Sequence, residues 1–409
     1  MYDNLLHQTI SEQLKSDLDS KQFPGSVLFS GPQGSGKLTA ALETARILSC
    51  TETPHAMWNC SCPSCLQHKA LVSGNLILTG PRDCTPEIAA ASYAFLQAAA
   101  NNASYLTAAR YLFLRSVRKL TLRFSQVLWN DDDKINKIAA VTSEIDEELE
   151  TVDFPHNLPD FKTVEKTCGK LVDLCQKLEK DFLYASIPIS HIRNVSSWAR
   201  MKSSGGTKTI IIENADRMLE SVRNALLKIL EEPPEDTVFI LTATRRSAVM
   251  PTILSRVRTY NFSERTLEQQ QDVISRVFHK NSFSGSIDDY LQTFLPVVPD
   301  QLRQSAKSFL SEIASGHIPD IQGVIKECKN FEPRIMLKVF LRGLLEYQRP
   351  LFKTPSGAQA SSCVVKAVQD CWNNVSVFNQ SVQSALEVLV KELSKVNKMY
   401  GNVLLCVIM

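Results

Sequence analysis

The stretch GPQGSGK, residues 31–37, fits the pattern G-x-x-x-x-G-K of a loop that cradles phosphate. An apolar run from Ser26 to Ser30 precedes it and predicts a buried strand, and an alanine-rich segment from Lys37 to about Leu48 predicts a helix. In a strand–loop–helix unit of this kind, backbone N–H groups and the helix N-terminus face the phosphate oxygens. The sequence therefore predicts a nucleotide site in which Lys37 reaches the β- and γ-phosphates.

The chain of 409 residues is long enough for about two to four domains. Its 44% hydrophobic and 22% charged residues exclude wholesale disorder and collagen-like repeats. Because 45 Lys and Arg residues balance 43 Asp and Glu residues, any contact with DNA would be local or shared with partner chains. No apolar run reaches the ~18 residues of a membrane span, and the first residues lack a signal-peptide pattern. We therefore expect a cytoplasmic protein whose 11 cysteines bind metal or stay reduced.

Two further apolar runs, residues 209–212 and 237–242, predict buried strands, with a helix over 217–232 between them. Such strands alternating with helices predict an α/β fold, a doubly wound parallel sheet covered on both faces. Residues 86–185 predict a helical insertion that begins with one helix over 88–108. We interpret it as a hairpin with solvated charged faces, and a dedicated binding module is the alternative.

Two positions argue against nucleotide hydrolysis. Leu38 stands where Ser or Thr normally binds Mg²⁺, and Thr39 lies about 100° further around the helix. Glu213 ends the predicted strand and offers a carboxylate for the metal, but Asn214 follows where an active ATPase has an acidic residue. Since an amide cannot act as a base, we expect ATP or ADP at a site with impaired Mg²⁺ binding. The alternative is a vestigial loop that keeps only its turn.

Residues 208–262 resemble the AAA+ subunits of bacterial clamp loaders, the gamma/tau and delta prime subunits of DNA polymerase III. The stretch ALLKILEEPP, residues 225–234, is highly specific to that family. The resemblance covers roughly residues 5–80 and 187–265, and it implies a P-loop NTPase domain at 1–265. It also implies a small helical lid at 266–325 and an all-helical collar domain at 326–409.

The resemblance implies roles for particular residues. Arg256, in the family's Ser-Arg context, would be an arginine finger that acts in trans on the ATP of a neighbouring subunit. Thr244 falls where the family has sensor residues. The expected nucleotide site consists of Gly31, Gly34, Ser35, Gly36, Lys37, Thr39, Glu213 and Thr244.

The function implied by the resemblance is that of a non-hydrolysing delta prime subunit, and the alternative is an active gamma/tau-type ATPase. The implied partners are the gamma/tau and delta subunits, the sliding clamp and, through the assembly, primed DNA.

Four cysteines in a short polar segment predict a structural Zn²⁺ site: Cys50, Cys60, Cys62 and Cys65. The family carries such a module here, with three cysteines spaced C-x-x-C-x-x-C after the first. In this chain the spacing between Cys60 and Cys62 is one residue shorter, so His55 or His68 could replace one ligand. A cluster of free thiols is the alternative.

Overall fold

The computed structural model describes residues 1–52, 55–130, 132–184, 186–202, 205–295, 299–328, 333–353, 355–376, 378, 380–401 and 403–404. Contacts along the chain divide it into two compact units, Met1–Leu291 and Gln292–Met409. Among the helices of these ranges, none is long and apolar enough to cross a membrane.

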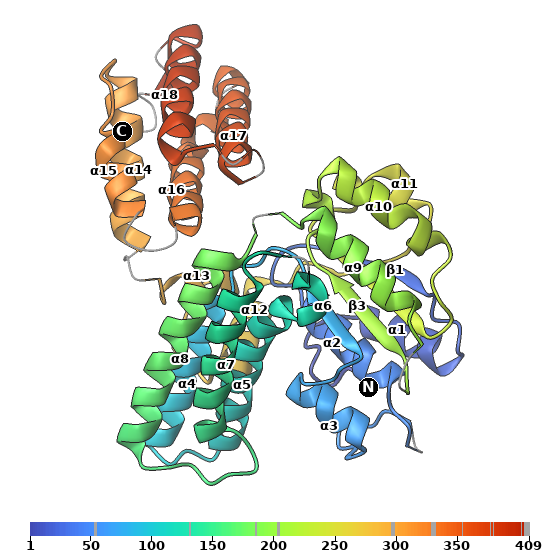
Figure 1. The fold of residues 1–409 in the computed structure, drawn as a ribbon. Coiled ribbons are helices and arrows are strands. Elements are labelled where there is room, and N and C mark those ends of the chain that lie inside the picture. The colour runs from blue at the N-terminus through green and yellow to red at the C-terminus, as the bar shows by residue number, and fades with distance from the viewer. Residues whose placement is uncertain are drawn as a thin grey trace. The chain divides into compact units, whose positions relative to one another are not determined.

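The first unit is built on a parallel sheet of five strands in the order β2-β3-β4-β1-β5 (Figure 1). The strands are β1 (Ser26–Ser30), β2 (Leu76–Thr79), β3 (Lys208–Ile212), β4 (Thr237–Ala243) and β5 (Arg258–Asn261). β1 lies between β4 and β5, and β3 lies between β2 and β4. The predicted strands at 26–30, 209–212 and 237–242 are confirmed, whereas β2 and β5 were not predicted.

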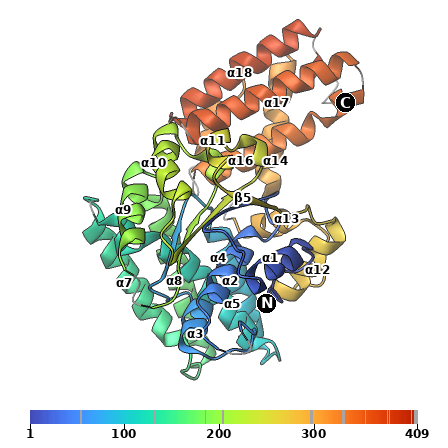
Figure 2. The same ribbon diagram turned by 90° about the vertical axis from the view of Figure 1, so that its right-hand side faces the viewer.

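Apolar side chains on both faces of the sheet are buried, because successive residues of a strand point to opposite sides. Ile211 lies in the apolar cluster that contains Phe29 and Ala41, while Ile210 and Ile212 lie in the cluster that contains Leu226. In Figure 2 the strands lie between α1 and α2 on one side and α9 and α10 on the other. The predicted α/β, doubly wound parallel sheet is confirmed.

The helices of the first unit cover this sheet and form the insertion. They are α1 (Ile10–Asp19), α2 (Lys37–Leu48), α3 (Pro63–Ala70), α4 (Thr85–Ala100), α5 (Leu106–Thr121), η1 (Leu122–Phe124), α6 (Gln126–Trp129), α7 (Ile135–Val152), α8 (Phe161–Phe182), α9 (Ile189–Arg200), η2 (Ala215–Arg217), α10 (Glu220–Glu231), η3 (Arg246–Ala248), α11 (Pro251–Leu254), α12 (Leu267–Phe278) and α13 (Ile287–Gln292).

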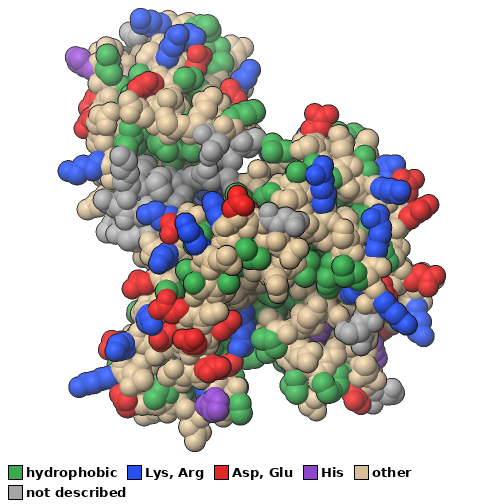
Figure 3. All heavy atoms as spheres, viewed as in Figure 1, with side chains coloured by type: hydrophobic (Ala, Val, Ile, Leu, Met, Phe, Trp, Pro, Cys, Tyr) green, Lys and Arg blue, Asp and Glu red, His purple; other side chains and the backbone are tan. Residues whose placement is uncertain are grey.

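The insertion contains four long helices rather than one hairpin. The expected single helix over 88–108 is wrong, because the chain turns after α4, where Asn102 has a φ of 45°. α4 packs on α5 and α8, and α7 packs on α8. Phe95, Phe113 and Leu171 of these helices belong to the same buried apolar cluster as Ile210 of the sheet. Its outer face is charged: Figure 3 shows acidic side chains gathered over this part of the molecule.

In the described residues of the second unit, all regular elements are helices. Its elements are α14 (Pro299–Ala314), α15 (Ile321–Cys328), α16 (Pro333–Tyr347), η4 (Arg349–Lys353), α17 (Pro355–Ser376) and α18 (Val382–Met399). Leu337 and Phe340 of α16 and Leu386 and Leu393 of α18 belong to one buried cluster. The expected boundaries at 265/266 and 325/326 stay a prediction.

Candidate functional site

The loop at residues 31–37 joins β1 to α2, as its pattern predicts. Gly36 has a φ of 93°, a backbone conformation that glycine adopts without strain. A Cβ at Gly31 would clash with the carbonyl oxygen of Phe262, so this position also requires glycine. Ser35 is buried, and its hydroxyl donates to the carbonyl oxygen of Pro32 at 2.8 Å. The loop therefore keeps the tight backbone that a phosphate cradle needs.

Lys37 is folded back onto this loop. Its Nζ donates to the carbonyl oxygens of Gly31 and Pro32, each at 2.6 Å. Burial lowers the pKa of Lys37 to about 8, although the nearby carboxylates of Glu213 and Asp216 oppose this shift. To meet a phosphate group, the ammonium group must exchange these carbonyl oxygens for phosphate oxygens.

Arg265, which the sequence did not single out, holds the loop from the other side. Its Nε and Nη2 donate to the carbonyl oxygen of Leu6, at 3.1 and 2.7 Å, and its Nη1 donates to the carbonyl oxygen of Gly34. The side chain is buried. It thus ties the phosphate loop to the N-terminal segment.

The end of β3 carries the expected metal carboxylate, but arginines engage both of its oxygens. Oε1 of Glu213 accepts a hydrogen bond from Nη1 of Arg82 at 3.0 Å, and Oε2 accepts one from Nη2 of Arg123. Burial alone would raise the pKa of Glu213, but Arg123 and Arg82 hold it below its usual value. Neither arginine was predicted as a site residue.

The neighbouring polar residues at this edge of the sheet are also paired within the chain. Asn214 adopts a left-handed conformation, with a φ of 57°, and its Nδ2 donates to the carbonyl oxygen of Pro81 at 2.6 Å. Both the N–H and the hydroxyl of Thr244 donate to Oδ2 of Asp216. A sensor role for Thr244 would therefore act through a side chain that is already bonded to Asp216.

Magnesium, which the resemblance implies beside the nucleotide, does not fit these residues. Mg²⁺ requires oxygen ligands in near-octahedral geometry. Leu38 offers none and is packed in the apolar cluster of α2, while Thr39 is half-buried one position further around the helix. A metal at Glu213 would have to displace a guanidinium group from an oxygen that now accepts its hydrogen bond.

Arg256 lies at the surface just after α11, about a quarter exposed (26%). Its Nε and Nη2 donate to Oε2 of Glu231, at 3.0 and 2.9 Å, and its Nη1 donates to the carbonyl oxygen of Thr252. Glu231 belongs to the stretch at 225–234 and is itself exposed. The guanidinium group of Arg256 is therefore paired with a solvent-exposed carboxylate, and it can dissociate from that carboxylate.

The four predicted cysteines converge after α2. Their Sγ atoms lie within 4.8 Å of one another, so Cys50, Cys60, Cys62 and Cys65 could hold a zinc ion. All four cysteines belong to this set, although the spacing between Cys60 and Cys62 is short. His68 lies outside this set, and its Nε2 bonds to the Ser73 hydroxyl at 3.2 Å.

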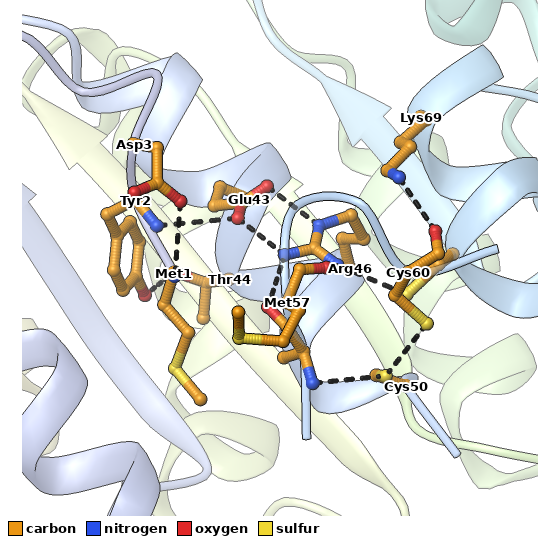
Figure 4. A network of polar contacts seen from close by, with 12 residues as sticks. Met1, Tyr2, Asp3, Glu43, Thr44, Arg46, Cys50, Met57, Cys60 and Lys69 are labelled. Carbon is orange, nitrogen blue, oxygen red and sulfur yellow. Dashed lines mark hydrogen bonds and ion pairs between the residues drawn. The ribbon is translucent and has the colours of Figure 1, made fainter. Parts of the chain in front are cut away.

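Arg46 of α2 connects this cysteine cluster to the phosphate-loop helix (Figure 4). Its Nη1 donates to Sγ of Cys65 at 3.1 Å, and its Nε and Nη2 donate to the carboxylate of Glu43 at 2.9 and 2.7 Å. An N–H directed at a thiolate is the kind of outer-shell contact that orients a metal ligand. The residues present therefore suit a structural zinc site.

The sequence matches the family described as "DNA polymerase III, delta subunit" over residues 6–129 and 154–266, which together make up more than half of the chain. The chain belongs to this family. The match spans the phosphate loop, the cysteine cluster, Glu213 and Arg256.

Its relatives include subunits of both types considered above. The chain is 29% identical to DNA polymerase III subunit delta' of Haemophilus influenzae over 109 residues, which are 26% of this chain and 29% of that protein. It is 36% identical to subunit delta' of Pseudomonas aeruginosa over 80 residues, 19% of this chain and 24% of that protein. It is 44% identical to subunit gamma/tau of Mycobacterium bovis over 55 residues, 13% of this chain and 10% of that protein.

The matched segments thus span less than a third of each of these relatives. Among solved structures, a DNA polymerase III gamma subunit-related protein of Thermotoga maritima shares 18% identity, with a TM-score of 0.27. That alignment covers 52% of this chain and 81% of the other.

Proposed function

We propose that the chain is a delta prime-type subunit of a bacterial clamp loader, which helps the ATP-driven assembly place a sliding clamp on primed DNA. In this proposal the chain does not hydrolyse ATP itself, and it supplies Arg256 to the ATP of a neighbouring subunit. Membership of the DNA polymerase III delta subunit family supports the placement in this machinery.

The observation that supports the non-hydrolysing role is the hydrogen bond of the Asn214 side chain. Its amide donates to the carbonyl oxygen of Pro81 at 2.6 Å, and an amide cannot take a proton from water. Leu38, buried among apolar side chains, adds no metal ligand. The experiment that tests this role is ATP turnover by the purified full chain. We expect negligible turnover, and rates on the order of 1 s⁻¹ or more would contradict it.

The trans role of Arg256 is supported by its chemistry and its position. A guanidinium group is permanently charged and can bond two phosphate oxygens at once. Arg256 is partly exposed, and its present partner Glu231 is an exposed carboxylate. Because exposed ion pairs contribute only ~0–1 kcal/mol, a γ-phosphate presented by another subunit can replace this partner at little cost.

A second candidate is an active gamma/tau-type ATPase. The complete loop at 31–37, with Lys37 in place, favours it, as do relatives of that name. ATP turnover by the isolated chain distinguishes the two candidates, since only the gamma/tau type hydrolyses ATP at its own site.

The remaining expectations belong to the same proposal. They are a structural zinc at the four cysteines, gamma/tau and delta subunits as partners, and a cytoplasmic location. The nucleotide-binding domain at 1–265 would be followed by a lid at 266–325 and a collar at 326–409.

A further inference from the structure

The carboxylate of Glu213 belongs to a network of buried and partly buried charged side chains that the sequence did not predict. Arg82 bonds to Glu213 and, through Nη2 at 2.8 Å, to Glu87 of α4. Lys119 of α5 bonds to the other oxygen of Glu87. Arg123 of η1 completes the set and is 1% exposed. The insertion thus contributes Glu87, Lys119 and Arg123 to the edge of the sheet at which phosphate would bind.

The cations of the network face carboxylates from several elements. Arg82, Lys119 and Arg123 pair with Glu87 and Glu213. A divalent cation at Glu213 would lie against the two guanidinium groups that already engage both of its oxygens. Because like charges at such short range repel, these side chains disfavour a metal at Glu213.

The arginines also have hydrogen-bond donors to spare. A guanidinium group carries five N–H donors. Among the described residues, Nε and Nη1 of Arg123 and Nε of Arg82 are buried and have no hydrogen-bond partner. An anion with several oxygens is the type of ligand that such donors accept.

Arg82 lies at the same edge of the sheet as the phosphate loop. It follows β2 by three residues, at the carboxyl edge where Glu213 ends β3 and the loop leaves β1. Its positive charge is one of the factors that lower the pKa of Lys37, although burial is the largest. Both side chains therefore lie at the same edge of the sheet.

We propose that Arg82, held by Glu213 beside Arg123, takes the place of the divalent cation, so that the loop binds the phosphate groups of a nucleotide without metal. Glu213 then serves as the anchor of the two guanidinium groups rather than as a metal ligand. This proposal rests on the proposed function only in treating residues 31–37 as a phosphate site.

The test is a titration of the full chain with ADP that carries an N-methylanthraniloyl fluorophore, once with excess Mg²⁺ and once with EDTA. The affinities should agree within about twofold, because no metal ligand contributes. Arg82→Gln should weaken binding by about tenfold or more, since it removes charge-assisted hydrogen bonds. Arg82→Lys should recover part of the loss by restoring the charge.

Arg276→Gln is the matched control, because Arg276 is 62% exposed and pairs with Asp272 on α12. It should leave the affinity unchanged. Binding at least tenfold tighter with Mg²⁺ would overturn the proposal. So would an Arg82→Gln affinity equal to that of the control, or no binding under either condition. The last result would leave the trans role of Arg256 untouched, because that role is measured on the ATP of another subunit.

Discussion

Removing Arg123 should destabilise the first unit far more than removing a comparable surface arginine. Arg123→Met keeps much of the side chain's volume but deletes its charge, next to a carboxylate that is 7% exposed. Breaking a buried ion pair by removing one partner costs about 3–5 kcal/mol. Arg82 still bonds to Glu213 in the variant. We therefore expect a loss near the lower end, about 3 kcal/mol of unfolding free energy.

Arg256→Met is the matched control, because it removes the same type of side chain from an exposed pair. Arg256 and Glu231 are 26% and 58% exposed, and such pairs contribute ~0–1 kcal/mol. Urea unfolding of the full chain, followed by circular dichroism, measures both variants against the wild-type protein.

A double-mutant cycle with Glu213→Gln separates the ion pair from general packing. If the pair itself is responsible, adding Glu213→Gln to Arg123→Met should cost less than Glu213→Gln costs alone. Equal losses for Arg123→Met and Arg256→Met, both below about 1 kcal/mol, would refute the buried network as a structural anchor.

Three further outcomes follow from the same contacts. The purified chain should contain about one zinc per molecule, and replacing Cys62 and Cys65 by Ser should release the zinc and lower the melting temperature. Protein that contains no zinc although no chelator was used in its purification would contradict the site. The affinity for labelled ADP should fall by up to about tenfold per pH unit above pH 8, because Lys37, whose pKa burial lowers to about 8, loses its proton there. Lys37→Arg should abolish that fall, and an affinity of the wild-type chain that does not change with pH would exclude a charged Lys37 as the ligand. Glu231→Gln should leave ATP hydrolysis by the assembly at or above the wild-type rate, since it frees Arg256; a loss as large as that of Arg256→Ala would show instead that Glu231 positions the finger.

The sequence identified three strands as continuous apolar runs. β1, β3 and β4 are buried along their whole length, and this burial is reflected in their mostly apolar residues. β5 was missed because only Tyr260 of its four residues is buried, so the strand is recognisable only through its pairing with β1. β2, Leu76–Thr79, is also buried along its whole length, but the sequence analysis did not single it out.

The same limit applies to the site. Lys37, Glu213 and the cysteines lie in local patterns whose chemistry can be recognised from spacing alone. Arg82, Arg123 and Arg265 meet their partners across 131, 90 and 231 positions of the chain, so no local pattern marks them. The helical insertion was recognised as helical, but its role in bringing Arg123 to Glu213 depends on tertiary packing.

The most direct test of the central claim is ATP hydrolysis by a clamp loader reconstituted with this chain, compared with the same assembly carrying Arg256→Ala. Arginine fingers contribute ~10³–10⁵-fold at the site they serve, and only one of several sites would lose it, so the total rate should fall in part. Arg256→Lys should rescue poorly, because an ammonium group cannot make the paired planar contact. The fold of the chain and its own nucleotide affinity should stay unchanged. Wild-type hydrolysis and clamp loading with Arg256→Ala would contradict the trans role.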